Sequence, residues 1–292
     1  SAENFANGAI KILDSLKIVD SFAFGAEAND LATLNNIANV LNEEPKGYTN
    51  ILNHELKKGI SYPAARENAI MMYLNDIKRY ANIMGNPNNI LAVEYLKALK
   101  NQKSKLTPIM IKRQKEYYNE HRIVDGYASA TGIRELLKNK EYSDVSKVVP
   151  RSTYQLLGQQ ANNGRMILSL EKYQKEIIYA LRKMTVEEIA ELPDVSEGLE
   201  NSIKNAANNC NNLTELINGI KSKRYTQTRI QRILIYALLG INKKMMENSK
   251  KIIPYTRILG FNSKGKMLIS EIMNKNPKIH LITSVKKYMD QN

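Results

Sequence analysis

The segment Ala128-Ser-Ala-Thr-Gly-Ile-Arg134 places two hydroxyl side chains and an arginine around the expected start of a helix. Ser129 or Thr131 can cap a helix over residues 133–138, whose first turn carries free N–H groups and the positive end of the helix dipole. Arg134 adds a forked cationic donor. These groups can hold phosphates, although the same string also suits an ordinary helix N-terminus.

Three further candidates lie where expected strands or helices meet loops. Gly25 follows a β-rich run and either lets a ligand approach the backbone or serves as a turn glycine. Asn88 and Asn89 either read an adenine or ribose edge through their amides or cap a helix. Arg113, after the second β-rich run, either neutralises a phosphate or is a solvated surface arginine. Ligands of open α/β sheets bind beyond the carboxyl ends of the strands, which favours a site at these loops.

The elements that position these residues alternate between helices and strands. The apolar spacing predicts a first helix ending near Lys17 and strands over residues 18–25 and 105–112. Between the strands it predicts several helices, one capped by Asn29 or Asp30 and one beginning at residues 86–90. This order predicts an α/β layer with parallel strands.

The second half of the chain is predicted to be mostly helical. Residues 144–165 lose clear periodicity and are interpreted as the passage between domains, so we expect one domain over 1–150 and another over 151–292. Asp194 with Glu197 has the pattern of a capping box for a helix over 195–208, and Asn212 with Glu215 repeats it. Near the C-terminus, residues 255–261 and 279–285 predict a small β unit around a turn at Ser263-Lys-Gly.

One helix of this half carries a basic face. Its buried stripe is predicted to contain Ile230, Ile233, Leu234, Ala237 and Leu238. On the opposite side lie Arg229, Arg232 and Tyr236, and the segment before them adds Lys221, Lys223, Arg224 and Tyr225. Cations with an aromatic ring can hold RNA phosphates and stack on an unpaired base. The alternative is a solvated basic helix.

Composition supports a polyanionic partner. The 292 residues carry a net charge of +14, and residues 221–260 hold ten Lys or Arg but one acid, which favours RNA and, as a second possibility, an acidic membrane surface. One cysteine excludes an intramolecular disulfide, and the three scattered histidines predict no structural metal. No apolar run has the length of a membrane span and no secretory signal is recognised, so we expect a cytoplasmic location.

Six strings in a fixed order give the sequence a family resemblance. They are residues 1–10, Gly59-Ile-Ser-Tyr-Pro-Ala-Ala-Arg66, residues 87–97, Ala128-Ser-Ala-Thr-Gly-Ile-Arg134, Pro193-Asp-Val-Ser-Glu-Gly-Leu-Glu200 and residues 221–232. Together they resemble the bacterial tRNA(Met) cytidine acetate ligase family over residues 1–265. Each string alone is weak, but the six together are specific.

The resemblance implies a partial Rossmann-like nucleotidyltransferase domain with a parallel sheet, followed by a mostly helical, basic tRNA-binding domain. It implies activation of acetate with ATP, accompanied by Mg²⁺, and transfer of the acetyl group to N4 of the wobble cytidine of elongator tRNA(Met). ATP contacts are implied for Gly25, Asn88, Arg113, Ser129, Thr131 and Arg134. Contacts with tRNA are implied for Lys221, Lys223, Arg224, Tyr225, Arg229 and Arg232.

The sequence departs from the family at one point. Members begin with a strand and loop carrying a His-x-Gly-His motif, and none of His54, His121 and His280 lies in such a string. We therefore expect an N-terminally truncated member with its catalytic residues unassigned. We expect adenylation by this chain to fail or be very slow, because loss of a preorganised charge stabiliser typically costs ~10² to 10³ in rate. We also expect an unpaired sheet edge or an exposed apolar face. A catalytically inactive tRNA-binding remnant and a nucleotidyltransferase for a small metabolite remain alternative interpretations.

Overall fold

The chain forms two compact units. The computed structural model describes residues 1–113, 123, 126–166, 168–196, 198–222, 225–252 and 254–284. Unit 1 comprises residues 1–113 and 247–292, and unit 2 comprises residues 114–246. This division places the boundary after residue 113 and not near residue 150. The described residues 126–150 belong to unit 2, and residues 247–284 return to unit 1.

Unit 1 contains both described sheets. Its first part is α1 (Ala2–Ser15), β1 (Ser21–Ala26), α2 (Leu31–Glu43), α3 (Lys46–Lys57), α4 (Tyr62–Tyr73), α5 (Ile77–Tyr80), α6 (Pro87–Asn101) and β2 (Thr107–Lys112). Its second part contains β3 (Tyr255–Arg257), α16 (Ser263–Lys275) and β4 (His280–Ile282). Helix α15 (Lys243–Lys251) crosses the division between the units.

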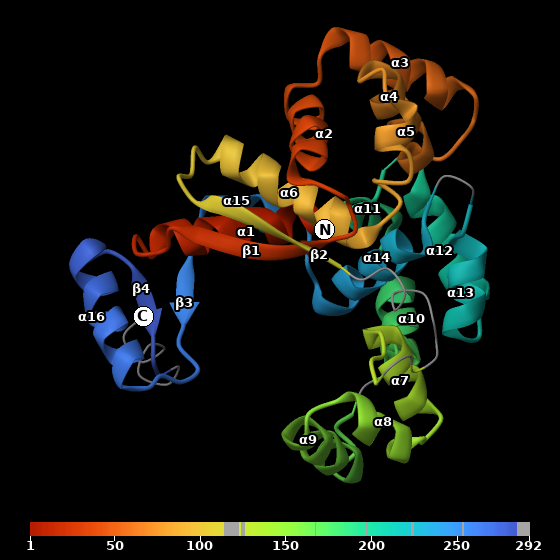
Figure 1. Ribbon diagram of the computed structural model, residues 1–292. Coiled ribbons are helices and arrows are strands. Elements are labelled where there is room, and N and C mark those ends of the chain that lie inside the picture. The colour runs from red at the N-terminus through yellow and green to blue at the C-terminus, as the bar shows by residue number, and fades with distance from the viewer. Residues whose placement is uncertain are drawn as a thin grey trace. The chain divides into compact units, whose positions relative to one another are not determined.

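Strands β1 and β2 pair in parallel, with Ser21 opposite Thr107 and Ala26 opposite Lys112. Figure 1 shows α6 running alongside them. Phe22 and Phe24 of β1 face α6, where their rings lie 5.5 and 5.8 Å from the ring of Tyr95. The predicted α/β architecture with parallel strands is therefore confirmed, and the two strands end together at one edge.

Strand β2 exposes apolar side chains. Ile109 is 48% exposed and Ile111 is 58% exposed, and in the described part of the chain β2 pairs with β1 alone. Since alternate residues of a strand point to opposite faces, the two isoleucines share one face. The predicted exposed apolar face is present.

Asp30 begins α2 and links it to α5. Its carboxylate accepts hydrogen bonds from the Thr33 N–H at 2.7 Å and from Arg79 Nη2 at 3.2 Å. The Thr33 N–H bond, opposed by partial burial and aided by Arg79, lowers the pKa of Asp30 below its ordinary value. Of the two predicted caps, Asn29 and Asp30, the structure uses Asp30.

This cap predicts a pH-dependent contribution to stability. A carboxyl whose pKa is lower in the folded state stabilises the fold above its unfolded pKa of about 4, and that stabilisation is lost as the pH falls through the folded pKa. We expect Asp30→Ala to lower the free energy of unfolding by about 1 kcal/mol at pH 7 and by less at acid pH. Asp30→Asn keeps a capping oxygen and should retain most of the stability without the pH dependence. Equal denaturation midpoints for wild type and Asp30→Ala at pH 7 would contradict this.

Helices form the regular elements of unit 2 within its described residues, and Ser222 and Tyr225 form an isolated β-bridge. Its elements are α7 (Ala130–Lys138), α8 (Tyr142–Val148), α9 (Arg151–Asn162), a 3₁₀ turn η2 (Leu170–Tyr173), α10 (Gln174–Lys183), α11 (Val186–Ala190), α12 (Leu199–Asn209), α13 (Leu213–Ile220) and α14 (Gln227–Leu239). A core formed by α10 to α14 contains the fully buried Ile177, Leu181, Ile203, Leu216 and Leu234. A smaller cluster around Leu136, Leu137 and Val145 holds α7, α8 and α9.

The prediction of an irregular passage over residues 144–165 was wrong. This stretch contains most of α8 and all of α9. Tyr154 and Leu157 of α9 pack against the small cluster of α7 and α8. Gly158 and the many polar residues of α9 weaken the helical pattern in the sequence, because this helix has only a narrow apolar face.

The prediction of a turn at Ser263-Lys-Gly was also wrong. The Asn262 side chain accepts a hydrogen bond from the Gly265 N–H at 2.9 Å, and helix α16 begins at Ser263. Because β3 and β4 are parallel, they need a long crossover connection, which α16 supplies.

Candidate nucleotide and RNA sites

Gly25 and Arg113 meet where β1 and β2 end. The Arg113 N–H donates to the Ala26 carbonyl at 2.8 Å, so the chain after β2 stays next to β1. A Cβ added to Gly25 would lie 3.2 Å from Cγ and 3.4 Å from Cδ of Arg113. The absent side chain therefore leaves room for the Arg113 stem, and the guanidinium end stays partly exposed, with the side chain 46% accessible.

This close approach predicts an effect of a side chain at position 25. Gly25→Val should displace the Arg113 side chain and lower nucleotide affinity, by about tenfold if Arg113 pairs with a phosphate. Gly25→Ala requires the arginine to shift by only a few tenths of an ångström and should cost less. Equilibrium dialysis measures whether nucleotide affinity falls from wild type to Gly25→Ala and further to Gly25→Val. Equal affinity of Gly25→Val and wild type would refute the prediction.

Glu27 is the centre of the polar contacts beyond β1. This carboxylate is 7% exposed, and its Oε1 accepts from Asn88 Nδ2 at 2.5 Å. Its Oε2 accepts from the Asn89 N–H at 3.1 Å, and Arg113 Nε lies 4.0 Å from Oε1. Buried carboxylates are tolerated when they are hydrogen-bonded and lie near a cation, as here. Glu27 thus joins the β1 loop to the start of α6 and to the end of β2.

Asn88 and Asn89 have different tasks. Asn89 is fully buried, and its Oδ1 accepts from the N–H groups of Glu27 and Ala28 at 2.8 and 2.9 Å. Its Nδ2 donates to the Ile83 carbonyl at 3.0 Å, so every polar group of its side chain is bonded within the chain. Asn88 is half-buried and bonds to Glu27 alone among the described residues. Neither residue caps α6, whose cap position is Asn86.

Gly25 therefore lies next to Arg113, and Asn88 and Arg113 both approach Glu27, which the sequence placed in the same loop but to which we assigned no function. The signal was present, because an acid immediately after a buried strand is unusual unless it has partners. The partners come from α6 and β2, which are distant in sequence, so the pairing required the tertiary structure.

The hydroxyl and arginine pattern of Ser129, Thr131 and Arg134 lies in unit 2, at the N-terminus of α7. Ser129 Oγ accepts from the Gly132 N–H at 3.0 Å, so Ser129 is the cap. Arg134 Nη2 donates to Thr131 Oγ1 at 3.2 Å, and both side chains are exposed. The capping function is confirmed, and phosphate binding by this segment stays a prediction.

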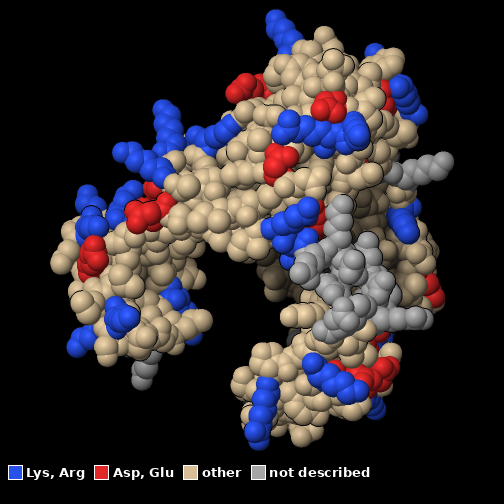
Figure 2. Space-filling view, viewed as in Figure 1, with Lys and Arg blue, Asp and Glu red and all other residues tan. Residues whose placement is uncertain are grey.

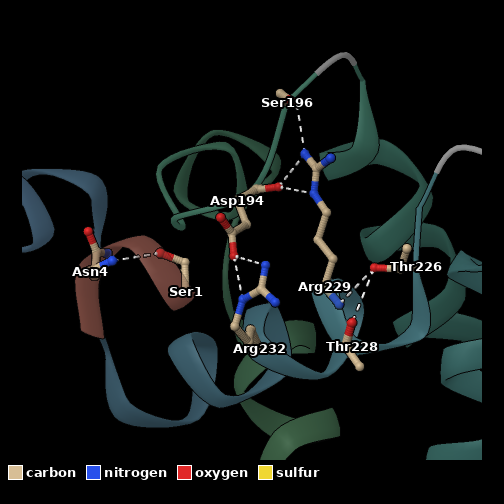
Figure 3. Close-up of polar contacts among 8 residues, drawn as sticks. All are labelled: Ser1, Asn4, Asp194, Ser196, Thr226, Thr228, Arg229 and Arg232. Carbon is tan, nitrogen blue, oxygen red and sulfur yellow. Dashed lines mark hydrogen bonds and ion pairs between the residues drawn. The ribbon is translucent and has the colours of Figure 1, made fainter. Parts of the chain in front are cut away.

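The basic helix predicted around residue 230 is α14. Ile230, Ile233, Leu234 and Ala237 are buried as predicted, whereas Leu238, predicted for the same stripe, is only partly buried against the core. Its arginines, however, are engaged within unit 2 (Figure 3). Arg229 donates to the Asp194 carbonyl at 2.9 and 2.7 Å and to Ser196 Oγ at 2.9 Å. Arg232 binds the Asp194 carboxylate, with Nε and Nη2 each 2.9 Å from Oδ2.

The predicted capping box at Asp194 and Glu197 was wrong. Helix α12 begins at Leu199 with Gly198 as its cap residue, and Glu197 lies outside the described residues. Asp194 instead adopts a left-handed backbone conformation, with φ of 67°, in the turn before α12. A non-glycine residue is strained there. Arg229 binds the Asp194 carbonyl and Arg232 binds its carboxylate, and these contacts hold Asp194 in that conformation.

The remaining predicted RNA contacts are only partly described. The Tyr225 ring packs under the Arg229 guanidinium at 4.9 Å, and its hydroxyl reaches the Ser196 carbonyl at 3.5 Å. Lys221 is exposed, and its side chain makes no ion pair within the described residues. Lys223 and Arg224 lie outside the described residues. Figure 2 shows Lys and Arg spread widely over the face drawn, with fewer Asp and Glu among them.

The described ranges contain neither a metal-binding cluster nor a membrane-spanning helix. Among these residues no three His, Cys, Asp or Glu side chains gather closely enough to hold a metal ion. Among the same residues no helix has the length and apolar content needed to cross a membrane.

Comparison with known proteins agrees with these features. The sequence pattern of the family described as HIGH Nucleotidyl Transferase matches residues 1–292. A tRNA(Met) cytidine acetate ligase of Thermoanaerobacter pseudethanolicus is 42% identical over 291 residues, covering 100% of this chain and 71% of the relative. One from Acetivibrio thermocellus is 41% identical over 282 residues, covering 94% of this chain and 68% of the relative.

Solved structures share the fold of the chain. The apo crystal structure of Thermotoga maritima TmcAL superposes with a TM-score of 0.90 at 30% identity, covering 99% of this chain and 69% of that one. The same protein bound with alpha-thio ATP superposes with a TM-score of 0.86, at the same identity and coverage. The chain belongs to the tRNA(Met) cytidine acetate ligase family of HIGH nucleotidyl transferases.

Proposed function

We propose that this protein is an ATP-dependent ligase that activates acetate as acetyl-adenylate and transfers the acetyl group to N4 of the wobble cytidine of elongator tRNA(Met). The family relationship supports this reaction, because the relatives that are 41% and 42% identical are named tRNA(Met) cytidine acetate ligases. The observation in this chain that supports it best is the cluster of Gly25, Glu27, Asn88 and Arg113 beyond β1 and β2.

The cluster has the chemistry that ATP requires. Asn88 offers an amide at the loop, and Arg113 offers a cation with its end partly exposed. Adenylation builds negative charge on the α-phosphate and on the leaving pyrophosphate, and a preorganised cation stabilises that charge without a protein nucleophile. We propose that Gly25, Asn88 and Arg113 contact ATP, and that Mg²⁺ accompanies the nucleotide.

A second set of groups is proposed for phosphates and RNA in unit 2. Ser129, Thr131 and Arg134 join an exposed arginine to a capped helix N-terminus, which suits a phosphate group. The segment from Lys221 to Arg232, including Lys223, Arg224, Tyr225 and Arg229, is proposed to contact tRNA. Because Arg229 and Arg232 also hold the Asp194 turn, we propose that they act partly by shaping the surface that RNA meets. A substrate of this kind implies a cytoplasmic location.

Incubation of the intact gene product with ATP, labelled acetate and tRNA(Met) tests the proposal. We expect label in the tRNA at the wobble cytidine and release of pyrophosphate that depends on acetate. Protein that binds tRNA with steep salt dependence, yet neither labels it nor releases pyrophosphate, would be an RNA-binding protein without this activity. A protein that transfers the adenylyl group to a small metabolite and does not bind tRNA would be a nucleotidyltransferase of another kind, and this result would also refute the proposal.

A further inference from the structure

Glu27 has its carboxylate bound on two sides by groups that differ in freedom to move. On one side the Asn89 N–H is a backbone donor fixed in the first turn of α6, 3.1 Å from Oε2. On the other side the Asn88 side-chain amide, 2.5 Å from Oε1, can rotate to offer either its NH₂ group or its carbonyl oxygen. Of these two donors, only Asn88 can exchange a donor for an acceptor when Glu27 changes. Arg113, whose Nε lies 4.0 Å from Oε1, carries donors alone and can move but cannot make this exchange.

A carboxylate accepts hydrogen bonds and cannot donate them. An amide oxygen placed 2.5 Å from Oε1 would be repelled, so the NH₂ group of Asn88 must face Glu27. The amide oxygen of Asn88 then points away from Glu27, and no donor of the described chain reaches it. Asn88 is half-buried, so this oxygen can meet a ligand.

We propose that Glu27 is a positioning residue that sets the nucleotide preference of the site by fixing which end of the Asn88 amide faces the ligand. This inference rests on the proposed binding of ATP. An outward oxygen selects a ligand group that donates a hydrogen bond. Adenosine has two such sources, the N6 amine of the base and the ribose hydroxyls, whereas inosine presents a carbonyl oxygen at the position of the amine.

Replacement by glutamine gives a sharp expectation. In Glu27→Gln the single amide oxygen must serve the fixed Asn89 N–H, so the new NH₂ group faces Asn88. Asn88 must then turn its own oxygen inward and its NH₂ group toward the ligand. The preference of the site should move from a donor to an acceptor, and therefore from ATP toward ITP.

The experiment measures dissociation constants of ATP, ITP and 2′-deoxy-ATP for the purified protein by equilibrium dialysis, which requires no turnover. We expect wild type to prefer ATP over ITP, and Glu27→Gln to lower that preference at least about tenfold, the value of one hydrogen bond gained and one lost. Asn88→Ala removes the outward oxygen without touching Glu27 and should bring the two affinities close together. This second variant carries the test if the glutamine variant does not fold.

Glu94→Gln is the matched control. Glu94 is also 7% exposed and lies on the same helix as Asn88, where it pairs with Lys97 at 3.1 Å. Its replacement should leave the ratio of ATP to ITP affinity unchanged, so that loss of a buried carboxylate as such is separated from loss of Glu27.

The two affinity ratios, ATP to ITP and ATP to 2′-deoxy-ATP, distinguish the possible outcomes. A fall in the ATP to ITP ratio in Glu27→Gln and Asn88→Ala assigns the read group to the N6 amine and supports the inference. A change confined to the ATP to 2′-deoxy-ATP ratio in Asn88→Ala would assign Asn88 to the ribose, whose hydroxyl accepts as well as donates, and would overturn it. ATP binding with both ratios unaltered in Glu27→Gln and Asn88→Ala would overturn it and leave the proposed function standing. Absence of ATP binding by wild type would refute both.

Discussion

Asn89→Ala is expected to lower the free energy of unfolding of unit 1 by about 3 kcal/mol and to abolish nucleotide binding. The substitution leaves the N–H groups of Glu27 and Ala28 and the carbonyl of Ile83 without their partner, in a fully buried environment. Each buried polar group that loses its hydrogen bond costs about 1–3 kcal/mol, and some of these will find water. Urea denaturation followed by circular dichroism measures the loss.

Asn88→Ala is the control for this prediction, since it removes the same side chain one residue earlier. Asn88 is half-buried and makes one hydrogen bond, so its loss should change stability by less than about 1 kcal/mol. Equal destabilisation by the two variants would mean that the loop after β1 is not held by Asn89. A stable Asn89→Ala variant that still binds ATP would contradict both parts of the expectation.

Arg229→Ala is expected to destabilise unit 2 by about 2–3 kcal/mol, since it removes charge-assisted hydrogen bonds to the Asp194 carbonyl and to Ser196 Oγ. Asp194 would lose part of the support for its left-handed conformation. We expect the turn before α12 to open and the affinity for tRNA to fall with it. Thermal unfolding and filter binding measure the two effects.

Lys221→Glu separates RNA contact from fold. Lys221 is exposed and makes no ion pair within the described residues, so the substitution should leave the unfolding transition in place. If Lys221 meets a phosphate, tRNA affinity should fall, and the plot of log affinity against log salt should become less steep by about one. Arg229→Ala with an unchanged unfolding transition and weaker tRNA binding would show that Arg229 serves RNA alone.

Local patterns determined much of unit 1 from the sequence alone. Short β-rich runs bounded by polar residues predicted both strands of the first sheet, and their order with the helices predicted the parallel pairing. Helix starts near Asp30 in unit 1 and near Ser129 and Asn212 in unit 2 were also readable, because a cap depends on residues three positions apart. The sequence left Asn29 and Thr131 open as alternative caps, and the structure uses Asp30 and Ser129. Gly25, Asn88 and Arg113 were predicted as ligand contacts from their places at the ends of expected strands and at the start of an expected helix, and their contact with ATP stays a prediction.

The tertiary structure decided the contacts between distant segments. Glu27 accepts a hydrogen bond from Asn88, 61 positions along the chain, and the Asp194 carbonyl accepts one from Arg229, 35 positions along the chain. Sequence periodicity placed Arg229 and Arg232 on the face away from the core but could not tell that a strained turn occupies that face. Hydrophobic patterning specifies which side of an element is buried. The partner of a polar side chain, in contrast, is decided by tertiary packing, which brings one particular loop within hydrogen-bonding distance of it.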